Sequence, residues 1–296
     1  MQHPRPIEAN SVATILLLGL LSGATLAQQP SIPAQQAATP TQQTKPPTLD
    51  EILTRLQQNL DEYKARVPSF FSDEHVASSN ANQSFATITD ASFRLKRVLN
   101  PDDSTTLEES HEVKMINGRP AAGDKLGGST YLRGAFSNGL ALVSLSQQAC
   151  MHLTLKPIKP KKPYIIEFVS VPASQRPRDC ILQEDNSGRV LIDPATMQIE
   201  RMEFSAPHHV TVPAYNTTPR QAASPFTRRW DVSVDYAPVL LGGKSFWLPS
   251  KIESKFSTTV MTGASYVTGS YEATYRNYHK LEVTARIVPG SDVPVK

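Results

Sequence analysis

The chain has 296 residues with 30 basic and 27 acidic side chains, so its formal net charge is only +3. A charge this small gives no concentrated basic face, and we expect no nucleic-acid partner. Two cysteines, without CxxC or HExxH spacing, are too few for a thiol-rich metal site, so we expect no metal and no cofactor.

The N-terminus has the three parts of a secretory signal peptide: a basic residue at Arg5, an apolar run over residues 12–21, and the stretch Thr25-Leu26-Ala27. We expect cleavage after Ala27 and export, most simply to the periplasm. The alternative is an uncleaved anchor, but the run is shorter than the roughly 20 apolar residues that span a bilayer. No later segment is long and apolar enough to cross a membrane, so we expect no integral membrane segment in the mature chain.

Residues 28–47 are built from Gln, Pro, Ala and Thr without a periodic apolar face, which predicts a disordered linker. Thr48 and Glu51 then have the spacing of a capping box. Apolar residues recur at steps of three and four over residues 49–63, and Pro68 forbids continuation, so we expect an amphipathic helix packed on a sheet.

Alternating patterns predict strands over residues 91–99 and 107–116, joined by turn residues 100–103 and antiparallel to each other. Residues 140–148, LALVSLSQQ, form a short apolar patch. At this length, periodicity cannot decide between a helix and a strand. We favour a short helix over residues 137–146, lying over a sheet edge and able to act as a lid.

Residues 151–155 and 164–171 flank KPIKPKKP, which is typical of a charged hairpin tip; an anionic-surface site is the alternative. Residues 164–171 are apolar on both faces, which predicts a central strand. Cys150 and Cys180 enclose this hairpin, and in an oxidising exported compartment such a pair is usually a disulfide.

Two further hairpins can be predicted directly. Residues 188–204 contain a strand, an Asp-Pro-Ala-Thr turn and a return strand. Residues 228–256 alternate apolar and polar side chains on both sides of Gly242-Gly243, a pair suited to the positive φ of a tight turn. A last strand is expected over residues 266–278.

The aromatic and aliphatic residues of the C-terminal half have two interpretations. They form the ordinary core of an antiparallel sheet, or a strongly curved sheet leaves its concave face partly unfilled and they line a cavity for a hydrophobic ligand. The candidate cavity-lining residues are Trp230, Val232, Val234, Tyr236, Phe246, Leu248, Ile252, Tyr271, Tyr275, Leu142 and Leu145.

Catalytic motifs are absent from the sequence, which has no GxSxG elbow, P-loop or dinucleotide fingerprint. Asp231 and Asp235 would lie roughly 13 Å apart along a strand, too far to exchange a proton directly. Adjacent residues such as His208 and His209 point to opposite sides of an extended chain. We therefore assign no catalytic residue, and a hydrolase with a site near the two histidines remains a third hypothesis.

The order of signal peptide, capped helix and antiparallel meander, with the hairpins GRVLIDPATMQIERMEF and YAPVLLGGKSFWLPSKIE, resembles exported proteins with a lipoprotein-carrier-like (LolA/LolB-type) fold. It is also similar to uncharacterised exported proteins of soil bacteria that end in a strand like YEATYRNYHKL. The resemblance covers about residues 48–288. It implies an unclosed barrel around helices with a hydrophobic cavity that holds acyl chains in the carriers, and it transfers no functional residue to this chain.

We therefore expect a mainly β (α+β) domain over residues 48–290, a strongly curved antiparallel sheet or unclosed β-barrel, and a tail at residues 291–296. The leading function is a periplasmic, non-enzymatic protein that binds a lipid, a lipoprotein acyl chain or another hydrophobic ligand. Its partners would be a lipid or lipidated protein. The alternative is a cell-envelope protein-interaction module without a ligand, whose partner would be an envelope protein.

Overall fold

The computed structural model describes residues 46–81, 85–127, 134–137, 139–207, 227–259 and 263–281. Internal contacts divide the chain into Met1–Thr44 and Lys45–Lys296, and the second unit contains every described residue. The following predictions lie wholly or mostly outside the described residues: the signal peptide 1–27, the linker 28–47, His208, His209 and the tail 291–296.

Helix α1, Leu49–Arg66, begins with the predicted capping box. The backbone N–H of Thr48 donates to Oε2 of Glu51 over 2.7 Å, and Oγ1 of Thr48 accepts from the N–H of Glu51 over 3.3 Å. These bonds satisfy backbone donors that a helix start otherwise leaves open. Five apolar residues of one stripe are buried: Ile52, Leu53, Leu56, Leu60 and Tyr63.

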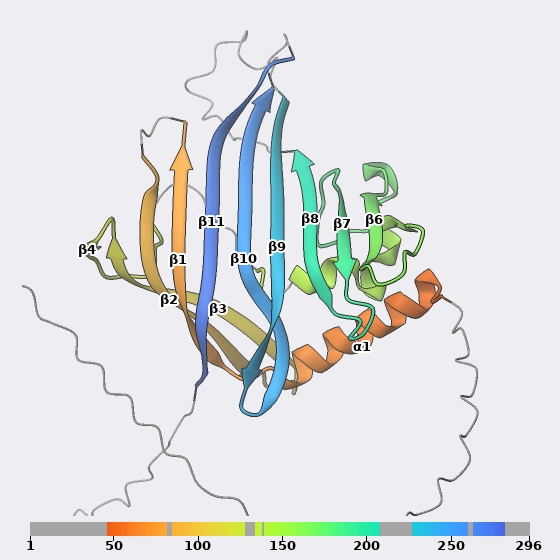
Figure 1. The fold of residues 1–296 in the computed structure, drawn as a ribbon, viewed down its shortest axis with the longest axis horizontal. Helices are drawn as coiled ribbons and strands as arrows, with labels where there is room; N and C mark the ends of the chain where they lie inside the picture. The colour runs from red at the N-terminus through yellow and green to blue at the C-terminus, as the bar shows by residue number, and fades with distance from the viewer. Residues whose placement is uncertain are drawn as a thin grey trace, which may run out of the picture. The chain divides into compact units, whose positions relative to one another are not determined.

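Eleven strands form one antiparallel sheet in the described part of the chain. Their order is β4-β3-β2-β1-β11-β10-β9-β8-β7-β6-β5, so β4 and β5 are the edges and the sheet is not closed (Figure 1). The strands are β1 Phe70–Asn80, β2 Thr87–Leu99, β3 Thr105–Ile116, β4 Arg119–Pro120, β5 Met151–Leu155, β6 Tyr164–Ser170, β7 Ser187–Ile192, β8 Ile199–Pro207, β9 Thr227–Leu241, β10 Lys244–Thr259 and β11 Ser265–Lys280. The expected mainly β, unclosed sheet with an N-terminal helix is confirmed.

The predicted hairpins are present as β2–β3, β5–β6, β7–β8 and β9–β10. In the last of these, Gly242 and Gly243 have φ of +58° and +80°, the left-handed conformation that glycine adopts without steric cost. The local turn chemistry therefore sets this reversal.

Two predictions need correction. Strand β6 is not central but second from the edge, and Val169 is 53 % exposed on its outer side, because only alternate residues of the apolar run face the core. In place of one short helix over residues 137–146, the chain forms two 3-10 helices, η1 Gly139–Val143 and η2 Leu145–Cys150; a third, η3 Ala173–Gln175, follows β6.

The sheet curves around α1. Asn59 Nδ2 donates to the carbonyl of Met197 in the β7–β8 turn over 2.6 Å, whereas the carbonyl of Ala65 accepts from Arg97 of β2. These two helix residues are roughly 9 Å apart along the axis, yet β2 and β7 are six strand positions apart, roughly 28 Å on a flat sheet. One helix can contact both strands only if the sheet bends towards it.

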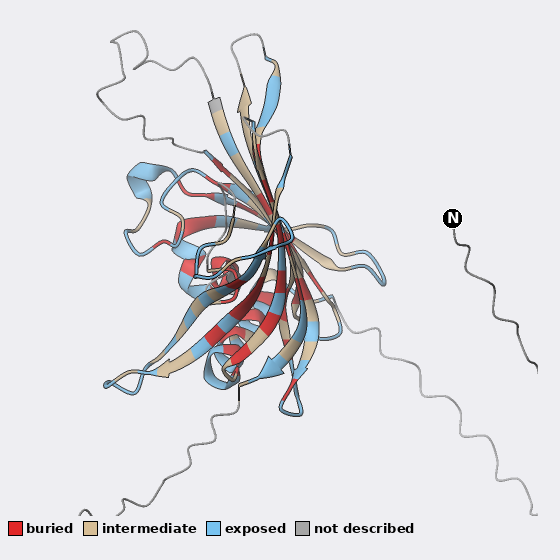
Figure 2. Cartoon of the chain, turned by 90° about the vertical axis from the view of Figure 1, so that its left-hand side faces the viewer, coloured by how far each residue is buried: buried red, intermediate tan, exposed pale blue. Residues whose placement is uncertain are grey.

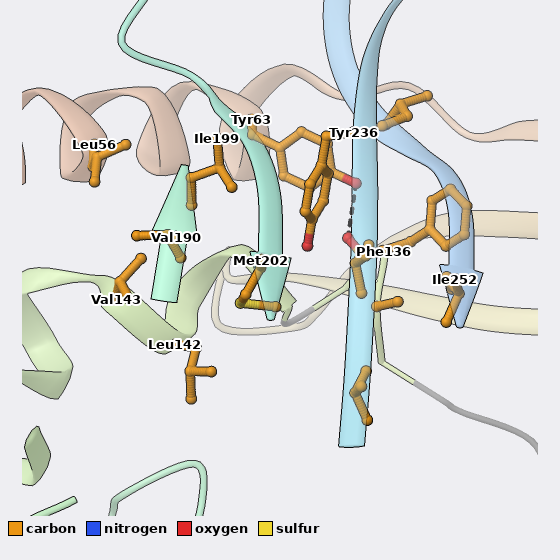
Figure 3. Packing of buried hydrophobic residues seen from close by; sticks show 14 of the residues in the cluster. Leu56, Tyr63, Phe136, Leu142, Val143, Val190, Ile199, Met202, Tyr236 and Ile252 are labelled. Carbon is orange, nitrogen blue, oxygen red and sulfur yellow. Dashed lines mark hydrogen bonds between the residues drawn. The ribbon is translucent and has the colours of Figure 1, made fainter. Parts of the chain in front are cut away.

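The core lies on the concave face, between the sheet, α1 and the two 3-10 helices. Figure 2 shows buried residues along the middle of the strands and exposed residues at the hairpin ends. In Figure 3, Leu56 of α1, Val143 of η1, Val190 of β7 and Ile199 of β8 meet in one apolar interior. Burial of this continuous cluster supplies the main driving force for folding.

Candidate functional site

The predicted cavity-lining residues lie on the concave face and are mostly covered by other protein atoms. Nine of them are buried members of the core cluster: Val232, Val234, Tyr236, Phe246, Leu248, Ile252, Tyr271, Tyr275 and Leu142. Trp230 is half-buried and packs at the edge of the cluster. Leu145 is 37 % exposed and lies apart from it.

Trp230 belongs to an aromatic group near one end of β9. Its ring stacks on Phe256 with centroids 6.0 Å apart and meets Phe204 edge-on at 5.5 Å. The indole Nε1–H donates to Oγ of Ser254 over 2.6 Å, which satisfies the polar end of this half-buried side chain.

Phe136 fills the other part of the concave face. Its ring stacks on Phe93 of β2 at 4.2 Å and meets Tyr275 of β11 edge-on at 4.8 Å, and Phe70 of β1 lies 6.0 Å away. Residues 134–137, which we call the plug segment, therefore place one aromatic side chain against residues of three neighbouring strands.

Polar contacts from one carboxylate hold the plug segment in place. Glu109 of β3 accepts from the backbone N–H groups of Gly134 (2.8 Å), Phe136 (2.9 Å) and Ser137 (2.7 Å). The hydroxyl of Tyr63 on α1 donates to the carbonyl of Phe136 over 2.8 Å (Figure 3). Hydrogen bonds to an ionised acceptor are stronger than neutral ones, so Glu109 acts as the main anchor of the plug.

Glu109 also affects the ionisation of the tyrosines around it. Burial, and after it the charge of Glu109, raises the pKa of Tyr63 well above its ordinary value. The same two causes, in the same order, raise the pKa of Tyr236. Both phenols therefore stay neutral at physiological pH, and Tyr63 keeps the proton that it donates to Phe136.

A second carboxylate is buried in the same face. Oε2 of Glu74 on β1 lies 2.6 Å from Nδ1 of His111 on β3, and the two side chains are 0 % and 9 % exposed. Glu74 is paired across the sheet with Tyr275, and His111 with Phe93. This polar pair therefore lies against the ring system that surrounds Phe136.

Two polar atoms near this pair lack a hydrogen-bond partner in the described part of the chain, Oε1 of Glu74 and Oγ of Ser72, whereas the hydroxyl of Tyr271 interacts with that of Tyr275. Each belongs to a residue that is at most 2 % exposed. A buried polar atom without a partner costs stability, so such atoms are rare in folded proteins.

The outer face of the sheet carries a different kind of surface. A hollow of about 490 Å³ lies over β6–β10 and includes Arg189, Glu203 and Asp231 in its lining. Nε of Arg189 is 2.7 Å from Oε2 of Glu203, and Nε of Arg229 is 2.6 Å from Oδ1 of Asp231. Neutralised pairs at a solvated surface contribute little and indicate no acid–base site.

Asp231 and Asp235 have different ion-pair partners, since Asp231 pairs with Arg229 and Asp235 pairs with Arg201 over 2.9 Å. The two carboxylates therefore belong to separate ion pairs on β9 and do not act together as an acid and a base. Within the described residues, no three His, Cys, Asp or Glu side chains gather as metal ligands would. The same residues include no helix with the length and apolarity needed to cross a bilayer.

Cys150 and Cys180 are joined in the predicted disulfide, with Cα atoms 5.7 Å apart. The bridge connects the end of η2 to the segment between β6 and β7. It therefore ties η2 to the end of the sheet that contains β5, β6 and β7.

The sequence matches no family model, and no curated protein matches it. Several solved structures resemble the chain at low sequence identity, and three of them are described here. A DUF1329 family protein from Desulfovibrio piger shares 8 % identity with a TM-score of 0.36, covering 81 % of this chain and 95 % of its own. A LolA superfamily protein from Nitrosomonas europaea shares 12 % with a TM-score of 0.32, covering 79 % and 94 %.

The third is a putative outer membrane lipoprotein-sorting protein domain from Vibrio parahaemolyticus, at 10 % identity and a TM-score of 0.33, covering 76 % of this chain and 90 % of its own. The expected resemblance to proteins with a LolA-type fold is therefore found among solved structures. The likeness is remote in both sequence and structure. The expected similarity to proteins of soil bacteria stays a prediction.

Four residues of the site were not predicted from the sequence: Glu74, Glu109, His111 and Phe136. A signal for three of them is present in the strand period. Glu74 is in phase with the buried Phe70 and Val76, and Glu109 and His111 are in phase with the buried Val113. Acidic residues in phase with buried apolar ones mark positions where a charge enters the core.

Proposed function

We propose that the protein is an exported, non-enzymatic binder of an apolar ligand, which occupies the concave face of the curved sheet when Phe136 leaves it. Phe136 is the observation that carries this proposal. Its ring packs in the core against Phe93 and Tyr275, yet it belongs to a connecting segment and not to a strand.

The plug is attached in a way that suits displacement. The surrounding rings belong to β1, β2 and β11, which are joined by strand pairing along most of their length, whereas the plug segment is held by Glu109 and Tyr63 through four hydrogen bonds. Water can replace such bonds when the segment moves, so the apolar contacts of a bound ligand have to offset only the net difference between the two sets of hydrogen bonds. An acyl chain or a similar apolar group could then bury the exposed rings.

Export is supported by two independent features. The first 27 residues have the layout of a signal peptide. The bridge between Cys150 and Cys180 is typical of an oxidising compartment. We propose the periplasm, with a lipid or a lipidated protein as the partner.

The open edges of the sheet favour a second function. Strand β5 at one edge has a neighbour only on the β6 side, among the described residues. Unpaired edge groups can add a strand from another chain, as an interaction module of the cell envelope would require. Crosslinking in cells decides this alternative, because a monomer band alone would contradict it.

The test of the leading proposal is binding of N-phenyl-1-naphthylamine, an uncharged fluorophore that brightens in apolar surroundings. We expect saturable binding, and tighter binding to Phe136→Ala because this variant lacks the competing ring. Phe85→Ala is the matched control, since Phe85 is 86 % exposed and should leave binding unchanged. Absence of binding to both the unmodified chain and Phe136→Ala would refute the proposal.

A further inference from the structure

The concave face contains a polar set that packing alone does not require. Ser72 and Glu74 of β1 are paired with Phe93 and Tyr275 respectively, and Tyr271 of β11 is paired with Ser78. Paired residues share a face of the sheet. The set therefore faces the core together with the aromatic rings that surround Phe136.

Glu74 has unused hydrogen-bonding capacity. His111 occupies Oε2, while Oε1 has no hydrogen-bond partner in the described residues, and the same holds for Oγ of Ser72. The hydroxyl of Tyr275 interacts with Glu74 and with the hydroxyl of Tyr271. A carboxylate can accept several hydrogen bonds. Ser72 and Glu74 are two residues apart on one face of β1, so one group that brings several donors into the face could satisfy both atoms.

The residues around Glu74 indicate what charge the bound group should carry. Aromatic rings from Phe93 and Tyr275 stand beside it, and a carboxylate with aromatic faces is the environment that suits a cation. Two carboxylates, Glu74 and Glu109, and one imidazole, His111, project into this region. An anionic head group would meet unfavourable charge there, whereas an ammonium group supplies three donors.

Tyr275 is part of the same set. Burial first, and then the charges of Tyr271 and Glu74, raises the pKa of Tyr275 well above its ordinary value. Its phenol therefore keeps its proton and adds no further negative charge. The set combines acceptors with neutral hydroxyls.

Access to the set depends on the plug segment. Phe136 stacks on Phe93, and Phe93 meets the ring of His111 edge-on at 5.6 Å. Phe136 also meets Tyr275 at 4.8 Å. Displacement of this one ring would open the apolar face next to Glu74.

We propose that Glu74, together with Ser72, Tyr271 and His111, forms a head-group subsite for the primary ammonium of an amphipathic ligand whose chain takes the place of Phe136. This inference rests on the proposed function, since it assumes that an apolar chain enters the concave face. It adds which end of the ligand is recognised, and by which residues.

Three twelve-carbon probes test the subsite: dodecylamine, dodecanol and dodecanoic acid. Each competes with bound N-phenyl-1-naphthylamine on the full chain, with the disulfide formed and below micelle-forming concentrations. The chains are equal, so differences report the head group. We expect the amine to bind about tenfold more tightly than the acid, with the alcohol between them.

Glu74→Gln keeps the shape and removes the charge, so we expect it to abolish the preference for the amine. Glu112→Gln is the matched control, because Glu112 is on β3 with its side chain 56 % exposed and paired with Arg94; it should keep the preference. Tyr271→Phe removes only a hydroxyl and should reduce the preference several-fold, which keeps the subsite testable if Glu74→Gln does not fold.

The outcomes separate the two proposals. Equal binding of amine and acid to the unmodified chain would overturn the ammonium subsite and leave the apolar-ligand function standing. An unchanged preference in both Glu74→Gln and Tyr271→Phe would also overturn it. Failure of the fluorophore and of all three probes to bind would overturn the proposed function itself.

Discussion

Glu109 joins β3 to the plug segment through three backbone N–H groups, at 2.7 to 2.9 Å. Such a cluster of amides on one carboxylate fixes the path of a short connecting segment more firmly than apolar contact alone. The position of Phe136 in the core therefore depends on a half-buried charged residue of β3.

We expect Glu109→Gln to loosen the plug segment. The amide keeps one acceptor oxygen but loses the charge and one acceptor, so the free energy of unfolding should fall by about 1–3 kcal/mol. Hydrogen exchange at Phe136 and Ser137 should become faster. Glu108→Gln, at the exposed neighbouring position, is the control, and equal exchange in the two variants would contradict the role of Glu109.

Two leucines of the β9–β10 hairpin allow a matched test of core packing. Leu248 is 0 % exposed and Leu240 is 70 % exposed. Leu248→Ala should lower the free energy of unfolding by about 2–5 kcal/mol, because it removes buried methyl groups and leaves a cavity. Leu240→Ala should change it by less than about 0.5 kcal/mol. Similar denaturation midpoints for the two variants would show that Leu248 does not serve as a core residue.

At the scale of elements, the disulfide controls how the 3-10 helices sit on the sheet. It closes a chain segment with a sequence separation of 30 residues, which includes the β5–β6 hairpin. Besides the bridge, η2 continues directly into β5, an edge strand of five residues, and Oε1 of Gln147 accepts from the N–H of Ile181 over 2.9 Å.

Replacement of Cys150 and Cys180 by serine should lower the free energy of unfolding by about 3–4 kcal/mol, the loop-closure entropy for a segment of this length. Chemical denaturation of the oxidised and the double-serine proteins measures the difference. Quantitative labelling of both thiols in unreduced protein from the exported fraction would contradict the bridge.

The hairpins could be predicted from the sequence because their information is local: alternation along each strand and a turn such as Gly242-Gly243. The pairing of β1 with β11 joins segments about 200 residues apart, as in Glu74 opposite Tyr275, and no local pattern specifies it. The apolar half of the site was therefore predictable. Its polar half was not, because Glu74, Glu109 and His111 resemble ordinary solvated strand residues until the curvature of the sheet is known.

At the scale of the molecule, five tyrosines of the core make the stability of the fold depend on pH. The pKa values of Tyr63, Tyr236, Tyr271, Tyr275 and Tyr278 are all raised above the ordinary 10.0, with burial as the largest cause. Above pH 10 the unfolded chain releases these protons while the folded chain retains them. Proton release then favours unfolding.

Stability should therefore be unaffected by these tyrosines below pH 10 and fall steeply as the pH rises above it. Tyrosinate absorbance and circular dichroism, followed together, should show the buried phenols ionising with the loss of structure. Ionisation of all nine tyrosines near pH 10 in a folded protein would contradict their burial.

The central claim is that the concave face accommodates a guest in place of Phe136. Extraction of the mature protein, purified from exporting cells, with organic solvent and mass spectrometry of the extract tests it most directly. We predict a reproducible apolar or amphipathic molecule, more abundant in Phe136→Ala than in the Phe85→Ala control. No such molecule in repeated preparations of any of these proteins, together with no binding of N-phenyl-1-naphthylamine, would contradict the account.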